Sequence, residues 1–197
     1  MVEWLLETDR KLFVFLNGLG SETFDGFWLV ITRQWAWIPF FLVILYLLVK
    51  HLGWKHVLLI ALMITVLLTF TDQTTNLVKK YFQRARPVNT PELADLIRAV
   101  QRRSSYSFFS GHASNSMAAA VFLYLVLRRY IKYMGFLFLW PLIFAYSRIY
   151  LGLHYPLDIL CGYIWGIIVG LLVFQLYRYC RNRIFPEKSL VDHPTNT

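Results

Sequence analysis

One short segment combines a histidine, a proline and an aspartate at a spacing suited to catalysis. His154 stands two residues before Pro156 and four before Asp158. Proline is favoured in the first turn of a helix, so Pro156 predicts a helix start that brings Asp158 within reach of His154. A carboxylate there would fix the imidazole tautomer and stabilise the charge that grows as the other ring nitrogen attacks phosphorus. A His–Asp hydrogen bond of purely structural value is the alternative.

A second segment, Ser110-Gly111-His112, opens an apolar helical stretch. The free N–H groups of a helix start, together with the helix dipole, favour a bound anion. A histidine at that point is placed to donate a proton to a leaving oxygen. The alternative is a serine N-cap followed by an incidental interfacial histidine.

Three cations accompany these groups. Lys79 and Arg86 are seven residues apart, about two helical turns, so both can face the same way. Pro87 pushes Arg86 out of helical geometry and ends the segment. Arginine offers a phosphate paired planar donors and lysine a point charge. Arg148 adds a third cation six residues before His154. A basic stretch that attracts lipid headgroups is the alternative for the first two.

The composition indicates a membrane protein. The 197 residues are 57% hydrophobic and only 16% charged, with a mean hydropathy of +0.49, whereas soluble domains carry about a quarter charged residues. The net charge is +9, and the basic residues border apolar runs. This placement favours an anionic membrane or substrate over nucleic acid as partner. A soluble all-α protein is the alternative, but its apolar helices would lack polar surface to cover them.

The apolar runs predict an all-α integral membrane helical bundle with about five to six transmembrane helices. A spanning helix needs about 20 mostly apolar residues. The charge-free runs are Gln34–Val49, Val57–Thr71, Ser104–Leu127, Tyr133–Ser147 and Ile159–Tyr177. We expect the corresponding helices at about 35–50, 56–82, 111–128, 132–148 and 156–180.

The remaining chain divides around this core. Residues 1–33 predict two amphipathic helices, interfacial or re-entrant, broken at 17–21, and they show no cleavable signal peptide. We expect a membrane-embedded core over 34–185 and a polar, disordered tail over 186–197. Within the long polar connection of the core, 92–103 predicts a surface helix.

The candidate residues lie at the end of the second span, the start of the third, the end of the fourth and the start of the fifth. In an alternating bundle these four places share one membrane face. The short basic connections at 50–56, 128–132 and 178–188 share the other face, which the positive-inside rule assigns to the cytoplasm. From compact size we infer a bacterium, and we place the site at the outer, periplasmic face of its cytoplasmic (inner) membrane.

Together these motifs resemble the type 2 phosphatidic acid phosphatase family, which shares its helical core with vanadium-dependent haloperoxidases. The likeness covers about 79–158 and consists of three ordered motifs: Lys79 with Arg86-Pro87, Ser110-Gly111-His112, and Ser147-Arg148 with His154 and Asp158. One position departs, because the family usually has proline where this chain has Phe109. That position shapes the turn before the helix.

The resemblance implies a phosphohistidine mechanism. His154 would attack phosphorus, Asp158 would orient it, and His112 would protonate the leaving group and then activate water. The groups implied to hold the phosphoryl oxygens are Lys79, Arg86, Arg148, Ser110 and Gly111. The family needs no metal and no cofactor, and converging cations would repel a metal held by the two histidines and the aspartate.

The expected substrate is a lipid phosphate or pyrophosphate, with undecaprenyl pyrophosphate as the first choice. Phosphatidate, phosphatidylglycerophosphate and lipid A phosphate are the alternatives. The alternatives from other functional classes are an anion transporter or channel and a catalytically inactive lipid-binding relative. Five further cations could meet a second phosphate or a sugar, but solvated loop charges are expected: Lys80, Arg84, Arg98, Arg102 and Arg103.

Overall fold

The computed structural model describes residues 2–186, and over this range the chain is helical with no strand. The α-helices are α1 (Val2–Gly18), α2 (Glu22–Ile31), α3 (Ile38–Leu52), α4 (Trp54–Phe82), α5 (Gly111–Leu127), α6 (Leu139–Tyr150) and α7 (Pro156–Ile184). The 3-10 turns are η1 (Gln34–Trp37), η2 (Pro87–Asn89), η3 (Pro91–Leu93) and η4 (Met134–Phe138). The predicted all-α bundle is confirmed.

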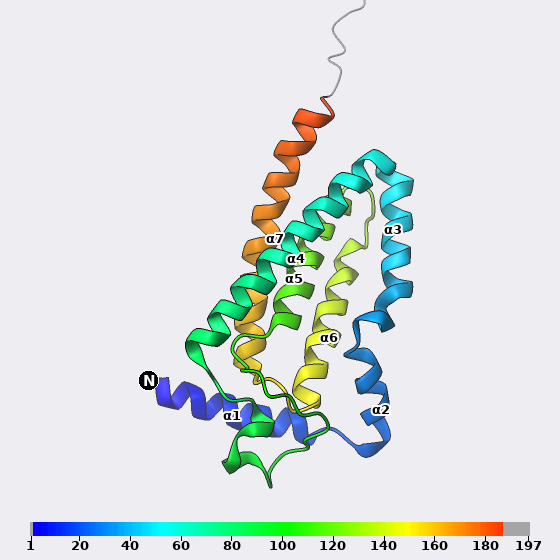
Figure 1. Cartoon of the computed structure of the whole chain (residues 1–197). Helices are drawn as coiled ribbons and strands as arrows, with labels where there is room; N and C mark the ends of the chain where they lie inside the picture. The colour runs from blue at the N-terminus through cyan, green and yellow to red at the C-terminus, as the bar shows by residue number, and fades with distance from the viewer. Residues whose placement is uncertain (1, 187–197) are drawn as a thin grey trace, which may run out of the picture.

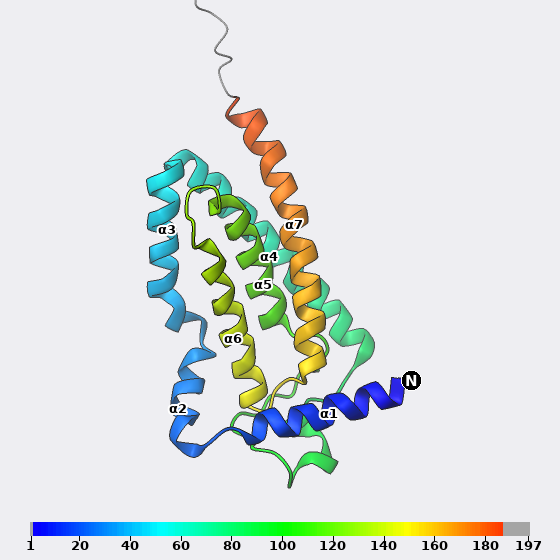
Figure 2. The same ribbon diagram turned by 180° about the vertical axis from the view of Figure 1, so that it is seen from behind.

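Helices α3 to α7 form the bundle, and α1 lies across one end of it (Figures 1 and 2). Helix α5 is the central member and packs against α4, α6 and α7. Its sequence explains that place, because it is apolar on all sides and therefore buried rather than amphipathic. Its first turn carries the Ser110-Gly111-His112 motif, so burial of the helix fixes that motif in space.

Close packing between α5 and α7 sets the position of the site. Three glycines spaced by four residues line α7: Gly162, Gly166 and Gly170. A Cβ on Gly166 would lie 2.5 Å from the Ser114 carbonyl oxygen, so only glycine allows this approach. Small residues let membrane helices pack backbone to backbone in this way. At the site end, the Ser110 N–H donates to the Asp158 carbonyl at 3.0 Å.

The outer surface of the bundle is apolar, as a lipid-facing surface must be. Leu160, Ile164, Ile168 and Leu172 of α7 are all exposed. Among residues 2–186, three helical segments are long and apolar enough to cross a membrane: Gln34–Leu52, Trp54–Leu93, which contains α4, and Pro156–Ile184. Helix α5 and the η4–α6 segment are shorter, and the 17 residues of α5 extend about 26 Å. The protein is thus a membrane protein whose central helices are its shorter ones.

The two ends of the bundle differ in character. The α3–α4 and α5–α6 connections meet at one end, where the rings of His51 and Tyr130 stack at 5.4 Å. The end of α7 joins them, since the rings of His56 and Phe185 lie 4.4 Å apart. The ends of helices that carry the chemical motifs lie at the opposite end, beside α1 (Figure 1). The alternation expected from the apolar runs is therefore present.

Helix α1 is joined to the bundle through a stripe of buried residues. Asp9, Phe13 and Asn17 recur every four residues and are all buried. The rings of Phe13 and Tyr155 meet edge to face at 5.4 Å. The Asn17 amide donates to the Tyr150 carbonyl at 2.9 Å. The predicted break after α1 is present, but the helix is bonded to the α6–α7 connection and does not merely rest on it.

The predicted surface helix over 92–103 is wrong. After η3 the chain forms turns and bends, and its backbone groups pair with distant elements. The Arg98 N–H donates to Asn17 Oδ1 at 2.7 Å, and the Gln101 N–H donates to the Leu151 carbonyl at 3.3 Å. Because these partners replace the helical i−4 carbonyls, no helix forms. Of the predicted disordered tail, residues 187–197 lie outside the described residues.

Candidate active site

The α6–α7 connection holds His154 beside Asp158. Helix α7 begins at Pro156, as its place in the first turn predicts. The Tyr155 N–H donates to Asp158 Oδ2 at 3.0 Å, which caps the helix and fixes the carboxylate. His154 Nδ1 lies 3.4 Å from the same oxygen, which is within ion-pair distance, although no hydrogen bond to Nδ1 is formed among the described residues. Both side chains are almost fully buried, so the pair is shielded from water.

Arg86 reaches His154 from the other side. Its Nη1 lies 3.1 Å from His154 Nε2 and also donates to the Leu153 carbonyl at 2.8 Å. Its Nε and Nη2 donate to the backbone and side-chain oxygens of Ser105 at 2.7 and 3.0 Å. A guanidinium can only donate, so Nε2 accepts and we assign the ring proton to Nδ1, facing Asp158. Nε2 therefore carries the lone pair that a nucleophile needs.

Electrostatics keep the His154 imidazole neutral. Burial lowers its pKa well below the ordinary 6.5, and the charges of Arg86, Arg148 and Lys79 lower it further. Burial, with the nearby charge of Arg103, also lowers the pKa of Arg86 to about 10. At neutral pH the site thus combines an unprotonated imidazole with protonated guanidinium groups.

Arg148 is a buried cation that still has a free donor. Only 1% of the residue is exposed, and one of its terminal nitrogens donates to the Thr32 hydroxyl. Its carbonyl accepts the N–H groups of Leu153 and His154 at 2.9 and 3.3 Å, which shapes the loop that carries the histidine. Its Nε is buried and finds no hydrogen-bond partner within residues 2–186. Buried donors are rarely left unpaired, so this one points to an anionic ligand.

The start of α5 supplies the second histidine. Ser110 is its N-cap, and its hydroxyl accepts the Ala113 N–H at 3.4 Å. His112 is half-buried, and its ring lies 5.1 Å from the ring of Phe144. Gly111 precedes it, where an added Cβ would touch Thr75 at 3.4 Å. His112 therefore lies against a buried aromatic side chain of α6.

The end of α4 places the first cation motif. Lys79 lies in the last turn of α4 and is half-buried. The helix stops after Phe82 because Gln83 adopts a left-handed conformation, φ 47°, that ends the helical hydrogen bonds. The chain then turns towards α7, so that Arg84 and Arg86 enter the site.

Two of the five cations assigned to solvated loops are instead held in ion pairs. Arg84 binds Asp158 Oδ1 at 2.6 Å and Asp9 Oδ2 at 2.7 Å. Arg98 binds both carboxylate oxygens of Asp25 at 2.9 Å. For Arg84 and Arg98 the expectation is therefore wrong. The other three are exposed as expected: Lys80, Arg102 and Arg103.

Asp9 was missed because its role depends on a partner 75 residues away. One signal could have found it. Asp9 shares a helical stripe with Phe13 and Asn17, and a carboxylate on the inward face of an amphipathic helix needs a partner.

The arrangement can support attack on phosphorus. A neutral imidazole whose Nε2 carries a lone pair lies against cations that would stabilise the charge on equatorial phosphoryl oxygens. A second histidine, His112, lies in the first turn of α5, whose N-cap Ser110 is bonded through its N–H to the Asp158 carbonyl, and an imidazole can exchange a proton with a leaving oxygen. Among the described residues, no three His, Cys, Asp or Glu side chains gather as metal ligands would. Fold and site define a membrane-embedded phosphatase.

The family follows from comparison with known proteins. The model of the PAP2 superfamily matches residues 54–182, which contain all three motifs. This chain belongs to the PAP2 superfamily.

Two relatives share the name Lipid A 4'-phosphatase. The protein of Bacteroides thetaiotaomicron is 38% identical over 180 residues, 88% of this chain and 79% of the relative. That of Porphyromonas gingivalis is 33% identical over 187 residues, 92% of this chain and 78% of the relative. A more distant relative, an undecaprenyl-diphosphatase of Sulfolobus acidocaldarius, is 27% identical over 84% of this chain and 77% of its own length.

Solved structures show the same fold. The PAP2-type phosphatidylglycerolphosphate phosphatase of Bacillus subtilis superposes with a TM-score of 0.66 at 18% identity, covering 93% of this chain and 89% of that one. LpxE of Aquifex aeolicus gives 0.61 at 23% identity, covering 84% and 94%. The chain is accordingly a bacterial membrane enzyme that hydrolyses lipid phosphates, and the transporter, channel and inactive-relative readings are set aside.

Proposed function

We propose that this enzyme removes a phosphate group from a lipid A-type glycolipid through a phosphohistidine intermediate. The reaction rests on one observation above all: His154 is held between Asp158 and Arg86 with the lone pair of Nε2 facing the Arg86 guanidinium. The substrate class rests on the two relatives named Lipid A 4'-phosphatase, which are aligned over most of this chain. This choice replaces undecaprenyl pyrophosphate, whose support is the more distant relative.

In the first step, Nε2 of His154 attacks phosphorus while the bond between phosphorus and the lipid oxygen breaks. His112 gives its proton to that oxygen, and the lipid leaves as an alcohol. Asp158 stabilises the positive charge on the imidazole through the Nδ1 proton. The intermediate is a phosphoryl group on Nε2.

In the second step, water attacks the phosphoryl group and the bond from phosphorus to Nε2 breaks. His112, now unprotonated, accepts the proton of the attacking water and so returns to its first state. Inorganic phosphate leaves and the His154 imidazole is regenerated.

The phosphoryl oxygens would be held by the cations and by the start of α5. The unpaired Nε of Arg148 supplies one donor at the buried side. Arg86 must turn from Nε2 towards the phosphate, because its present hydrogen bond occupies the attacking lone pair. Lys79, the Ser110 hydroxyl and the Gly111 amide complete the proposed set. Donors already in place stabilise charge without reorganisation during the reaction.

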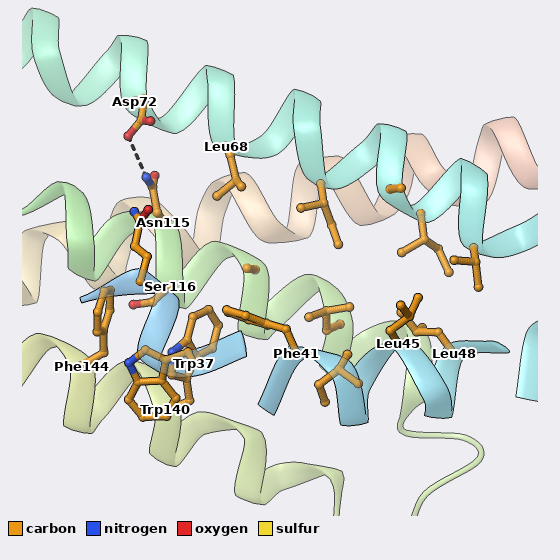
Figure 3. A pocket seen from close by; sticks show the side chains of 18 residues that line it. Trp37, Phe41, Leu45, Leu48, Leu68, Asp72, Asn115, Ser116, Trp140 and Phe144 are labelled. Atoms are coloured by element: carbon orange, nitrogen blue, oxygen red, sulfur yellow. Dashed lines mark hydrogen bonds between the residues drawn. The ribbon is translucent and has the colours of Figure 1, made fainter. Parts of the chain in front are cut away.

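A groove beside His112 fits the hydrocarbon part of such a substrate. It holds about 580 Å³ between α3, α4, α5 and α6 and is lined mostly by apolar side chains. Figure 3 shows Phe144 and Trp140 at the end where Asn115 donates to Asp72, and Leu45 and Leu48 towards the other end. Since the Phe144 ring meets His112, an acyl chain in this groove would place its headgroup near the site.

We place the site at the periplasmic face of the bacterial cytoplasmic membrane. The opposite end of the bundle carries the short basic connections, and these favour the cytoplasmic side. Lys50 and His51 end α3, and Arg181 and Arg183 end α7 at that end. A reporter that works only in the cytoplasm should therefore be active when it is fused after residue 186.

The test is phosphate release by the purified enzyme from a panel of lipids, with EDTA present throughout. The panel comprises bis-phosphorylated lipid A, undecaprenyl pyrophosphate, phosphatidate and phosphatidylglycerophosphate. We expect the highest kcat/KM on lipid A, with mass spectrometry showing loss of one phosphate, and no activity in His154→Gln. Preference for another lipid would overturn the substrate, and an active His154→Gln or a block by EDTA would overturn the mechanism.

A further inference from the structure

Arg84 joins two buried carboxylates from distant parts of the chain. Its Nη1 lies 2.6 Å from Asp158 Oδ1 and its Nη2 lies 2.7 Å from Asp9 Oδ2. The carboxylate of Asp158 is fully buried and that of Asp9 is 4% exposed. The guanidinium also lies over the Tyr155 ring at 4.0 Å. Arg84 is therefore fixed by two ion pairs and a stacking contact.

Asp9 has a second contact that ties α1 to the start of α7. Its Oδ1 accepts the Leu157 N–H at 2.8 Å, one residue before Asp158 in the first turn of α7. Burial raises the pKa of Asp9, while Arg84 and the Leu157 N–H oppose that rise. Burial alone would lower the pKa of Arg84, but Asp158 and Asp9 together raise it. Each charge of the chain Asp9–Arg84–Asp158 thus depends on its neighbour.

The backbone around Arg84 is held as firmly as its side chain. The left-handed Gln83 ends α4 one residue earlier, and the Ser107 N–H donates to the Arg84 carbonyl at 2.9 Å. The Ser107 hydroxyl lies 3.2 Å from the same carbonyl. An arginine in a freely solvated loop would have none of these constraints.

We propose that Arg84 and Asp9 are positioning residues, through which α1 holds Asp158 ionised and aimed at Nδ1 of His154. Neither touches the reacting atoms in this scheme, and the inference rests on the proposed nucleophilic role of His154. Helix α1 is then a working part of the active site and not only an interfacial anchor. The residues that position the catalytic groups are then found on both sides of the boundary expected at residue 33.

Loss of the Arg84 cation leaves Asp158 and Asp9 buried near each other with no shared counter-ion. The carboxylates then take up a proton more readily, and a protonated Asp158 no longer stabilises the imidazolium. The groups that face His154 from all sides are Asp158 on α7, Arg86, Lys79 on α4, Arg148 on α6 and His112 on α5. All of these groups are kept in an Arg84 variant, so a change in the pH profile reports on the contacts that run from Asp9 through Arg84 to Asp158.

The experiment compares Arg84→Met, Arg84→Lys, Asp9→Asn and the double variant Arg84→Met/Asp9→Asn with wild type. We expect kcat to fall by about 10- to 100-fold in Arg84→Met, the range known for outer-shell partners that orient a metal-bound histidine, with KM within about twofold. The acid limb of its kcat/KM profile should move to higher pH. The double variant should be no worse than Arg84→Met, because both residues act through one chain of contacts.

The matched control is the Arg98–Asp25 pair, which also ties an N-terminal helix to the loops at this end of the bundle. Asp25→Asn and Arg98→Met remove a comparable ion pair that does not reach Asp158, and they should leave kcat and the pH profile unchanged. Tryptophan fluorescence during heating shows whether each variant is folded. Arg84→Lys keeps the charge and should recover part of the activity.

Two failures can be told apart. An active His154→Gln would overturn the proposed mechanism, whatever the Arg84 variants do. If His154→Gln is inactive, a folded Arg84→Met with wild-type kcat and pH profile would overturn only the positioning role of Arg84 and Asp9. Additive losses in the double variant, or equal losses in the Arg98–Asp25 control, would also overturn it.

Discussion

Arg86 Nη1 lies 3.1 Å from His154 Nε2, so the cation proposed to bind phosphate covers the nitrogen proposed to attack it. The contact orients the lone pair of Nε2 and favours the unprotonated imidazole. An incoming phosphoryl group offers Arg86 a stronger, charge-assisted partner, and its move would uncover Nε2. In the proposed mechanism, phosphate binding and exposure of the nucleophile would then be a single event.

This relationship predicts the effect of Arg86→Lys. A lysine keeps the charge but cannot hold Ser105, Leu153 and the phosphate together with planar paired donors. We expect kcat/KM for lipid phosphate to fall by about 100- to 1000-fold, the range for loss of one donor to transition-state charge. Weaker product inhibition by inorganic phosphate should accompany the loss. A folded Arg86→Lys with near-normal kcat/KM would show that Arg86 does not bind the phosphoryl group.

The pH dependence follows from the neutral state of His154. Burial and the neighbouring cations hold its pKa well below 6.5, so the imidazole stays unprotonated in mildly acidic solution. Activity that needs the unprotonated form is lost only when the pH falls through that lowered pKa. We expect kcat/KM not to fall between about pH 7 and pH 6, a range in which an ordinary histidine nucleophile would become mostly protonated.

The measurement uses a lipid phosphate whose own ionisation has been followed by 31P NMR, so that its titration can be removed from the profile. Tryptophan fluorescence at each pH confirms that the enzyme is folded. A drop in kcat/KM centred near 6.5 would mean that the attacking group has an ordinary histidine pKa.

The sequence predicted the arrangement of the helices well, because apolar runs and their alternation are local signals. Pro156 marked the start of α7 correctly, and Gly111 the start of α5. The helix predicted over 92–103 is absent because the Asn17 side chain of α1 hydrogen-bonds the N–H and the carbonyl of Arg98. This contact joins residues 81 positions apart, so no local sequence pattern contains it. Which face of α1 turns inward also depends on the bundle it meets. For the same reason, the spacing of the motifs could not predict that Asp9 pairs with Arg84.

The apolar groove predicts a chain-length effect for Ala61→Phe. Ala61 of α4 lines the groove, and a phenyl ring there would fill part of its volume of about 580 Å³. We expect kcat/KM for a long-chain lipid phosphate to fall by about tenfold or more, through KM, since the apolar chain loses its contacts. Hydrolysis of a short-chain, water-soluble phosphate should be unchanged.

Leu62→Phe is the matched control for that variant. Leu62 is 56% exposed on the neighbouring surface of α4 and does not line the groove. It adds the same ring to a lipid-facing position, so both substrates should react as in wild type. Equal behaviour of Ala61→Phe and Leu62→Phe would show that the hydrocarbon chain binds elsewhere.

The contact between α5 and α7 predicts a stability effect for Gly166→Ala. The added Cβ would lie 2.5 Å from the Ser114 carbonyl and 3.0 Å from the Ala118 amide nitrogen, both backbone atoms that cannot turn away. The helices must separate, at a cost of about 1–3 kcal/mol, typical of overpacked sites. Thermal unfolding in detergent should show a lower Tm.

Gly26→Ala separates this packing effect from helix propensity. Gly26 lies within α2, and a Cβ there meets no atom within 4 Å among the described residues. Alanine favours a helix over glycine by about 1 kcal/mol, so Tm should stay the same or rise. Because α5 carries His112 and α7 carries Asp158, separation of the helices should also lower kcat in Gly166→Ala. A Gly166→Ala protein as stable and active as Gly26→Ala would mean that this contact is looser than the structure shows.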